Sequence, residues 1–230
     1  MEMMNGWSNV GAKEGQGEGK EVKYVKFPEG ASIIRLLDEA PRSYWQHWIG
    51  KAQNGKGCGI ACIGKDCPIC EIIKKEKAEK AKVRTYTAKM THSINVLVKK
   101  LGTQDLNEVM VLEQGNGLFG QIKDQMTMLQ TMGMSTDLRN VDLIVNRTGS
   151  GFSDTKYSVM VNAMSAKPLT EEEKALEKYD LTEIKPKLNR EQVLELMNGK
   201  SLDEVCKTEE SLEPADISNE VQAVDFSQAY

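Results

Sequence analysis

The chain of 230 residues has a net charge of −4 at pH 7, and 40% of its residues are hydrophobic. This length suffices for one substantial domain with tails or for two small domains, and the lack of a long apolar run excludes a transmembrane helix. The charge is uneven, because residues 20–167 carry 22 basic and 15 acidic side chains whereas residues 168–230 carry 7 and 16. This asymmetry predicts a polyanion-binding body with an acidic tail.

Residues 1–19 are rich in glycine and have a net charge of −2, which predicts a flexible N-terminal arm. In the core at residues 20–167, β-branched, aromatic and alternating apolar residues predict short strands. These are expected at 22–27, 31–37, 42–49, 84–90, 94–98 (as a continuation of the previous strand or a separate one), 108–112, 140–147 and 155–161.

Pro68, which suits the first turn of a helix, and the i,i+4 pair Glu76–Lys80 predict a helix to about Lys82. Leu118, Ile122, Met126 and Leu129 lie at helical spacing and predict a second helix over residues 118–132, with this stripe in the core. After Pro168 the composition changes, and a helical C-terminal extension is expected over residues 168–207, with helices near 170–179, 189–199 and 201–205. The acidic residues 208–230 are expected to be disordered. Short strands with a few helices between them indicate a mainly β fold with α insertions, such as a small barrel or sandwich.

Four of the five cysteines lie within thirteen positions of one another. Cys67 and Cys70 enclose two residues, a spacing that lets two thiolates bind one ion. His47 with either Cys58 or Cys62 would complete one tetrahedral set, and the four cysteines would complete another. A closed set of Cys and His ligands is typical of a structural zinc site, whereas a catalytic zinc keeps an open position. We therefore expect a structural Zn²⁺.

Ordinary thiols or a disulfide are the alternatives to a metal site. The glycine- and lysine-rich loop around the cysteines is poor core material, and no signal peptide is recognisable, which argues against a disulfide framework. The nearest acids, Asp66 and Glu71, form no His/Glu motif, which argues against a catalytic metal. The zinc subdomain is expected to span about residues 47–82, and Cys206 is expected to be a free thiol.

Basic and aromatic residues occur together in several of the expected strands. Basic side chains that neutralise phosphates and aromatic rings that stack on bases are the two features of proteins that bind single-stranded nucleic acid. For any one aromatic residue, a place in the core is at least an equal alternative. The residues expected to contact DNA are Tyr24, Lys26, Arg35, Arg42, Tyr44, Trp45, Trp48, Lys51, Arg84, Tyr86, Lys89, Arg147, Phe152, Lys156 and Tyr157.

The run GASIIRLLDEAPRSYWQHW, followed by CIGKDCPICE, resembles the single-stranded DNA-binding proteins of tailed phages, namely the helix-destabilising protein of the T-even phages and its wider relatives. The likeness covers roughly residues 20–165 and includes the hairpin VDLIVNRTGSGFSDTKYSVMV. It implies an OB-fold barrel with a zinc-bearing subdomain and sequence-tolerant binding of single-stranded DNA. It also implies a non-enzymatic role in phage DNA replication, recombination and repair in the cytoplasm of the infected cell, with an acidic tail that contacts replication and recombination proteins.

In the T-even relative the zinc ligands run His, Cys, Cys, Cys, an order that carries over to His47, then Cys58 or Cys62, then Cys67 and Cys70. The run ACIGKDCPIC resembles the form found in the wider group, which favours Cys62 with Cys58 as the alternative. The T-even relative also has a basic N-terminal segment that supports cooperative binding. The N-terminal arm here is acidic instead, which argues against that mode of cooperativity.

Two other functions compete with this interpretation. One is a zinc-dependent nuclease or recombination enzyme, and the other is a zinc-stapled protein–protein adaptor. The sequence contains neither clustered carboxylates of the two-metal type nor a Gly-x4-Gly-Lys-Ser/Thr motif, which argues against the enzyme. Hydrolysis of labelled DNA would identify the enzyme, and salt-dependent DNA binding would argue against the adaptor.

Overall fold

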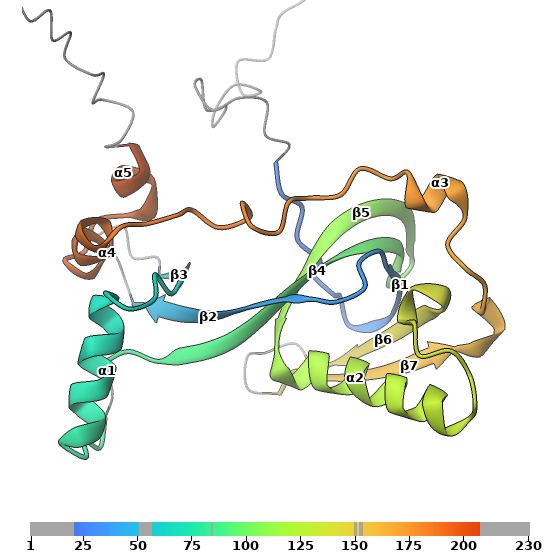
Figure 1. The fold of residues 1–230 in the computed structure, drawn as a ribbon, viewed down its shortest axis with the longest axis horizontal. Coiled ribbons are helices and arrows are strands. Elements are labelled where there is room, and N and C mark those ends of the chain that lie inside the picture. Colours follow the sequence, from blue (N-terminus) through green and yellow to red (C-terminus); the bar gives the residue numbers. More distant parts are fainter. Residues whose placement is uncertain (1–20, 51–56, 84, 150, 152–153, 208–230) are drawn as a thin grey trace, which may run out of the picture. The chain divides into compact units, whose positions relative to one another are not determined.

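The computed structural model describes residues 21–50, 57–83, 85–149, 151 and 154–207 (Figure 1). These residues form two compact units. The first, called the sheet unit, combines the described residues of Met1–Ser43 with those of Thr91–Ile184. The second, called the cysteine unit, combines those of Tyr44–Met90 with those of Lys185–Tyr230. The division into arm, core, extension and tail expected from the sequence stays a prediction.

An antiparallel sheet forms most of the sheet unit. Its strands follow the order β4 (Ala88–Leu101), β1 (Gly30–Leu36), β6 (Asp142–Thr148) and β7 (Lys156–Asn162), and β5 (Gln104–Gly115) pairs with β4. The expectation of a mainly β fold with α insertions is confirmed, and the OB-fold barrel stays a prediction. Within the described residues, no helix is long and apolar enough to cross a bilayer.

The helix α2 (Asn116–Thr131) packs against this sheet (Figure 1). Its buried residues are Leu118, Phe119, Ile122 and Leu129. They join one hydrophobic core with strand residues such as Ile34, Val96 and Leu143. Burying each such side chain contributes about 1.5–3 kcal/mol relative to exposing it. Met126, which the helical spacing predicts in the core, is instead 39% exposed.

Two glutamines of α2 bind backbone groups of β7. The Gln121 carboxamide accepts from Val159 N–H at 3.0 Å and donates to Tyr157 C=O at 2.8 Å. The Gln125 carboxamide accepts from Val161 N–H at 3.2 Å. These hydrogen bonds satisfy backbone groups on a strand that pairs with β6 alone among the described strands, and such groups would otherwise be open to another chain.

The first of the expected strands, over residues 22–27, does not form. Tyr24 makes only an isolated parallel bridge to Val111, in which Val25 N–H donates to Val111 C=O at 3.0 Å. Pro28 follows and has no N–H with which to extend a ladder. Farther along, the strands expected at 84–90 and 94–98 are joined in β4, which begins at Ala88.

The helix expected over residues 170–179 is also shorter, because α3 spans only Glu171–Lys174. The chain after it is tied to the side chain of Asn95, which is buried in the sheet unit. Tyr179 N–H donates to Asn95 Oδ1, and Asn95 Nδ2 donates to Tyr179 C=O, both at 3.0 Å. These are the backbone groups that a longer helix would use, so the tertiary contact replaces the helix.

A cluster of charged groups lies beside the core. Arg35 is fully buried, and its Nε donates to Asp142 Oδ1 at 2.6 Å while its guanidinium also donates to Ser165 C=O at 3.1 Å. Lys99 Nζ lies 2.9 Å from the same Asp142 oxygen, and the Glu173 carboxylate lies 3.6 Å from Arg35 and 3.7 Å from Lys99. The expectation that Arg35 contacts DNA is therefore corrected, because its guanidinium is enclosed by protein groups.

We predict that Asp142→Ala destabilises the protein by about 3–5 kcal/mol, since it leaves the buried Arg35 charge without its closest partner. The double variant Arg35→Met/Asp142→Leu removes the unpaired charge and should recover most of the loss. Urea unfolding followed by circular dichroism measures both free energies. A loss below about 1 kcal/mol for Asp142→Ala, the range of a surface pair, would contradict the assignment.

Candidate metal centre and nucleic-acid interface

The cysteine unit contains a strand pair that separates its residues onto two faces. In β2 (Arg42–Ile49) and β3 (Cys58–Ala61), His47 pairs with Ile60 and Trp48 pairs with Gly59. His47 and Ile60 are buried, whereas Trp48 is exposed, as the alternation of side chains along a strand requires. The strand β3 is not predicted from the sequence because Ile60 is its only large apolar residue.

A tight turn leads from β3 to α1 (Pro68–Ala78) and brings the last cysteines back toward β2. Gly64 adopts a left-handed conformation with φ +92°, which favours glycine. Cys67 is the N-cap residue of α1, and Pro68 occupies the first turn, where its missing N–H costs nothing. Cys70 follows in the same turn, so both thiols lie at the positive end of the helix dipole.

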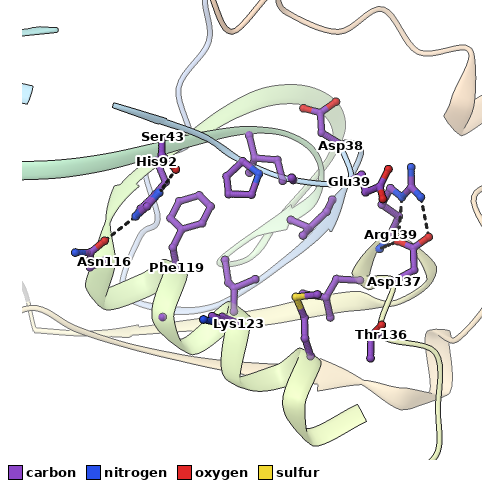
Figure 2. A pocket seen from close by; sticks show the side chains of 18 residues that line it. Asp38, Glu39, Ser43, His92, Asn116, Phe119, Lys123, Thr136, Asp137 and Arg139 are labelled. Carbon is purple, nitrogen blue, oxygen red and sulfur yellow. Dashed lines mark hydrogen bonds and ion pairs between the residues drawn. The ribbon is translucent and has the colours of Figure 1, made fainter. Parts of the chain in front are cut away.

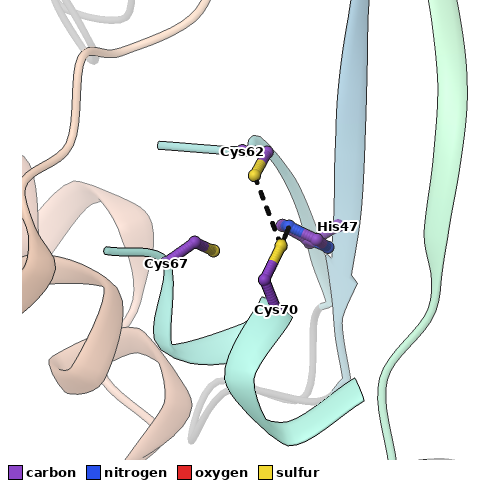
Figure 3. A group of neighbouring side chains, drawn as sticks. All are labelled: His47, Cys62, Cys67 and Cys70. Atoms are coloured by element: carbon purple, nitrogen blue, oxygen red, sulfur yellow. Dashed lines mark hydrogen bonds between the residues drawn. The ribbon is translucent and has the colours of Figure 1, made fainter. Parts of the chain in front are cut away.

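Four side chains from these elements converge (Figure 3). The ligand atoms of His47, Cys62, Cys67 and Cys70 all lie within 4.8 Å of one another. Cys70 Sγ lies 3.5 Å from Cys62 Sγ and 3.4 Å from His47 Nε2. Tetrahedral zinc, with bonds of about 2.0–2.3 Å, separates its donors by about 3.5–3.8 Å. The group is therefore positioned to hold a metal ion and is consistent with zinc.

A backbone hydrogen bond and burial favour the protonation state of the His47 imidazole that can bind a metal. Its Nδ1 lies 3.3 Å from the backbone C=O of Thr87, an arrangement that assigns the proton to Nδ1 and directs the lone pair of Nε2 toward the cysteines. Burial lowers the pKa of His47, although the hydrogen bond to Thr87 acts in the opposite sense. The ring is therefore neutral near pH 7, as a metal ligand must be.

The cysteine thiols, in contrast, must lose a proton and become charged in order to bind a metal. Burial, together with the neighbouring thiols of Cys62 and Cys67, raises the pKa of Cys70 to about 12. A thiolate at this position consequently needs a cation beside it. With three sulfur donors and one nitrogen donor, the four residues form a closed set that is suited to structural binding and leaves no position for a substrate.

Cys58 lies outside this group. It begins β3 and pairs with Ile49, two positions from Ile60 in the direction away from the turn. Burial raises the pKa of Cys58, so the thiol stays protonated near pH 7. The fifth cysteine, Cys206, is half-buried on α5 (Leu202–Lys207).

The C-terminal helices complete the core of the cysteine unit. Val193 and Leu196 of α4 (Arg190–Met197) and Val205 of α5 pack in one cluster with Ile69 and Ile73 of α1. This association is not evident from the sequence, because it joins segments more than one hundred positions apart.

An ion pair connects the same helices. The Arg190 guanidinium binds the Glu71 carboxylate through two contacts of 2.8 and 3.0 Å and donates to Asp66 C=O at 2.6 Å. The hydrogen bond from Arg190 lowers the pKa of Glu71. Asp66 and Glu71, the acids nearest the cysteines in the sequence, therefore contact Arg190 and tie α4 to the turn that carries the metal ligands.

The residues expected to contact DNA have different surroundings. Lys26, Trp45, Trp48, Lys89 and Lys156 are exposed. Tyr24, Arg42, Tyr44, Tyr86, Arg147 and Tyr157 are half-buried. Lys51, Arg84 and Phe152 lie outside the described residues. Trp45 and Trp48 are the two exposed large aromatic residues of the described chain, with 51% and 58% of their surfaces accessible.

Several of the half-buried residues make contacts within the protein. Tyr24 Oη donates to Ile184 C=O at 2.9 Å, and the Arg42 guanidinium donates to Leu181 C=O. Arg147 donates to the backbone C=O of Phe27 at 2.8 Å, and Tyr157 packs edge-on against the Phe27 ring with centroids 5.9 Å apart. These contacts explain the partial burial of the side chains by their structural roles.

The sheet unit contains a pocket of about 660 Å³ (Figure 2). Its walls come from the turn after β1, from β4, from α2 and from the segment around η1 (Leu138–Asn140). His92 is held by Ser43 Oγ at 2.7 Å from Nδ1 and by Asn116 Oδ1 at 2.6 Å from Nε2. These contacts fix the imidazole against the Phe119 ring, at a centroid distance of 5.1 Å. This pocket is not evident from the sequence, because its walls come from four separate segments.

Comparison with known proteins adds one match. A family model described as gp32 DNA binding protein like matches residues 28–205. Among curated proteins, no significant match to the chain is found. The matched region contains the four clustered metal-ligand candidates and most of both units.

We predict that Cys62→Ser lowers the metal content of the purified protein, whereas the matched variant Cys58→Ser leaves it unchanged. The reason is that Cys62 Sγ lies in the group of four donors and Cys58 Sγ does not. Elemental analysis of the two variants and the parent protein measures this directly. Loss of metal in Cys58→Ser with retention in Cys62→Ser would reverse the assignment.

Binding of Zn²⁺ to the metal-free protein is expected to release protons. The pKa of Cys70, raised to about 12 by burial and by the adjacent thiols, keeps this group protonated near pH 7, and it must lose its proton to bind a metal. The affinity should therefore rise with pH and fall on acidification. Calorimetric titration in two buffers that differ in ionisation enthalpy counts the protons, and a count of zero at neutral pH would be incompatible with thiolate ligation.

Proposed function

Since the chain belongs to the gp32 DNA binding protein like family, whose model covers residues 28–205, we propose that it binds single-stranded DNA without sequence specificity. Family membership is the observation that carries this proposal. The exposed basic and aromatic side chains support it, because they offer the two kinds of contact that sequence-tolerant binding needs. Coating and protection of single strands in phage DNA replication, recombination and repair is the corresponding biological role.

Binding proceeds by electrostatic and stacking contacts. Exposed cations such as Lys26, Lys89 and Lys156 neutralise phosphates and release counterions, so that affinity falls steeply with salt. The exposed rings of Trp45 and Trp48 stack on bases, each contact contributing about 1–3 kcal/mol. Because only single strands are bound, the protein shifts the equilibrium of a duplex toward melting by mass action. No covalent step is involved, and the protein is not an enzyme.

The metal in this proposal is a structural Zn²⁺ held by His47, Cys62, Cys67 and Cys70. The composition of the donor set and the spacing of its atoms support this ion. When bound, zinc supplies the positive charge that keeps buried thiolates ionised. The four ligand residues join β2, the end of β3 and the start of α1 into one folded unit.

The wider organisation belongs to the same proposal. The core at residues 20–167 is an OB-fold barrel with the zinc subdomain at about 47–82, and the N-terminal arm expected at residues 1–19 lies outside the described residues. The extension at 168–207 leads to the acidic tail at 208–230, which has six acidic and no basic residues and contacts replication and recombination proteins. The mainly antiparallel sheet and the charge of the tail support these assignments, and the host cytoplasm is the place of action.

The test is a fluorescence titration of the metal-loaded protein with poly(dT) at several salt concentrations. We expect saturable tryptophan quenching and an affinity that falls with a log–log slope of about −0.7 for each phosphate contact. Lys89→Ala removes one exposed cation and should make the slope shallower by about 0.7. The matched variant Lys200→Ala, whose ammonium is paired with Glu195 at 2.8 Å, should leave the slope unchanged.

The competing functions give different results in the same assay. Absence of binding at low salt by the folded, metal-loaded protein would reject single-strand binding and favour a zinc-stapled adaptor. Metal-dependent fragmentation of labelled DNA would favour a nuclease instead.

A further inference from the structure

The indole of Trp48 lies on the backbone of the segment that leads into β3. A Cβ atom placed on Gly57 would be 2.9 Å from Cζ2 and 3.1 Å from Cε2 of this indole. A Cβ atom on Gly59, the residue paired with Trp48, would be 3.5 Å from Cε3. All three ring atoms belong to the six-membered ring of the indole. That ring is therefore in contact with a stretch of chain on which two alternate residues have no side chain.

The contact with the backbone at Gly57 and Gly59 leaves the ring of Trp48 partly open to solvent. Trp48 is 58% exposed although one side of its ring contacts backbone, so the remaining surface is available to a ligand. The opposite face of the same two strands carries His47 and Ile60, both buried. Exposing a large apolar ring on the outer face contributes little to folding, because burial is what stabilises apolar surface. An aromatic ring that is backed by backbone and open outward has the form of a stacking platform.

The part of the sequence that contains Trp48 is strongly basic. The segment Tyr44–Met90 carries ten basic and four acidic residues. Lys65, Lys74 and Lys75 of this segment are exposed. A flat apolar ring within a strongly basic segment suits a ligand that combines flat aromatic groups with negative charge, which is the chemistry of a single-stranded nucleic acid.

We propose that Trp48 is a base-stacking platform and that Gly57 is its positioning residue, since any side chain at this position would place a Cβ atom 2.9 Å from the indole. This inference rests on the proposed function and deepens it by identifying the residue that orients one of the two exposed indoles expected to stack on bases. The side chain of Trp45 lies on the other face of β2 by alternation, so it does not contact the glycines that lie against the Trp48 ring.

Trp48→Ala should weaken binding to poly(dT) about 5- to 150-fold, the range measured for loss of one stacked base, without changing the salt slope, because no charge is removed. Trp48→Phe should recover part of the affinity because it keeps a smaller ring. A merely structural role for Trp48 would be revealed by loss of bound metal or of thermal stability, so both are measured for each variant.

Gly57→Ala tests the positioning role while the tryptophan is kept. The added Cβ would also lie 2.9 Å from Ile49 C=O, so circular dichroism and metal content must establish that the variant folds. Gly50→Ala is the matched control, because a Cβ atom there meets no other atom within 4 Å. In a background of Trp7→Phe and Trp45→Phe, Trp48 is the only tryptophan. Poly(dT) should quench the fluorescence of Trp48 strongly in this background. The quenching should be weaker when Gly57→Ala is added and unchanged when Gly50→Ala is added.

The outcomes separate this inference from the function on which it rests. Parent protein that binds poly(dT), together with Trp48→Ala that binds equally well, would overturn the platform and leave the proposed function intact. Equal quenching in the Gly57→Ala and Gly50→Ala variants would overturn the positioning role. Parent protein that fails to bind would reject the proposed function, and the platform with it. If Gly57→Ala does not fold, the affinities of Trp48→Ala and Trp48→Phe still decide the platform.

Discussion

The cysteine unit depends on the convergence of His47, Cys62, Cys67 and Cys70. These residues come from β2, from the chain that follows β3 and from the first turn of α1. The buried apolar cluster around them is small, and units with small cores generally need a metal, a disulfide or another staple. Without a cation, the same site would bring three thiols together, and burial with the neighbouring thiols raises the pKa of Cys70, so that its thiolate is disfavoured. The arrangement is therefore most readily understood as a fold completed by metal binding.

Much of this centre could be predicted from the sequence, because the Cys-x2-Cys spacing is local and its geometry is fixed by the start of a helix. The choice between Cys58 and Cys62 could not be derived from strand alternation. Both lie two positions from Ile60, the residue that pairs with His47, so both are on the metal side of the strand. What distinguishes them is the turn at Gly64, which brings Cys62 toward Cys67 and leaves Cys58 at the far end of β3. Only the resemblance to a family favoured Cys62 beforehand.

The predicted DNA contacts illustrate where local patterns stop being informative. Arg35 belongs to a basic and apolar strand like several exposed cations, yet its partner Asp142 lies 107 positions away in the sequence. The short α3 and the clustering of α4 and α5 with α1 have the same origin, since distant contacts decide each of them. Strand and helix types were largely predictable from periodicity, whereas side-chain partners across long separations were not. Residue composition alone could not distinguish an arginine that binds phosphate from one that neutralises a buried aspartate.

The pairing of His47 with Ile60 has a consequence for strand register. Side chains alternate along a strand, so a slip of one residue in β2 would turn His47 outward and Trp48 inward. The segment around β3 is short and contains two glycines, features that specify register only weakly by themselves. A metal ion that requires His47 on the inner face excludes the slipped pairing. The ion would thus act as a register lock, and the orientation of an aromatic ring on the far side of the strands would follow from coordination chemistry that the ring never touches.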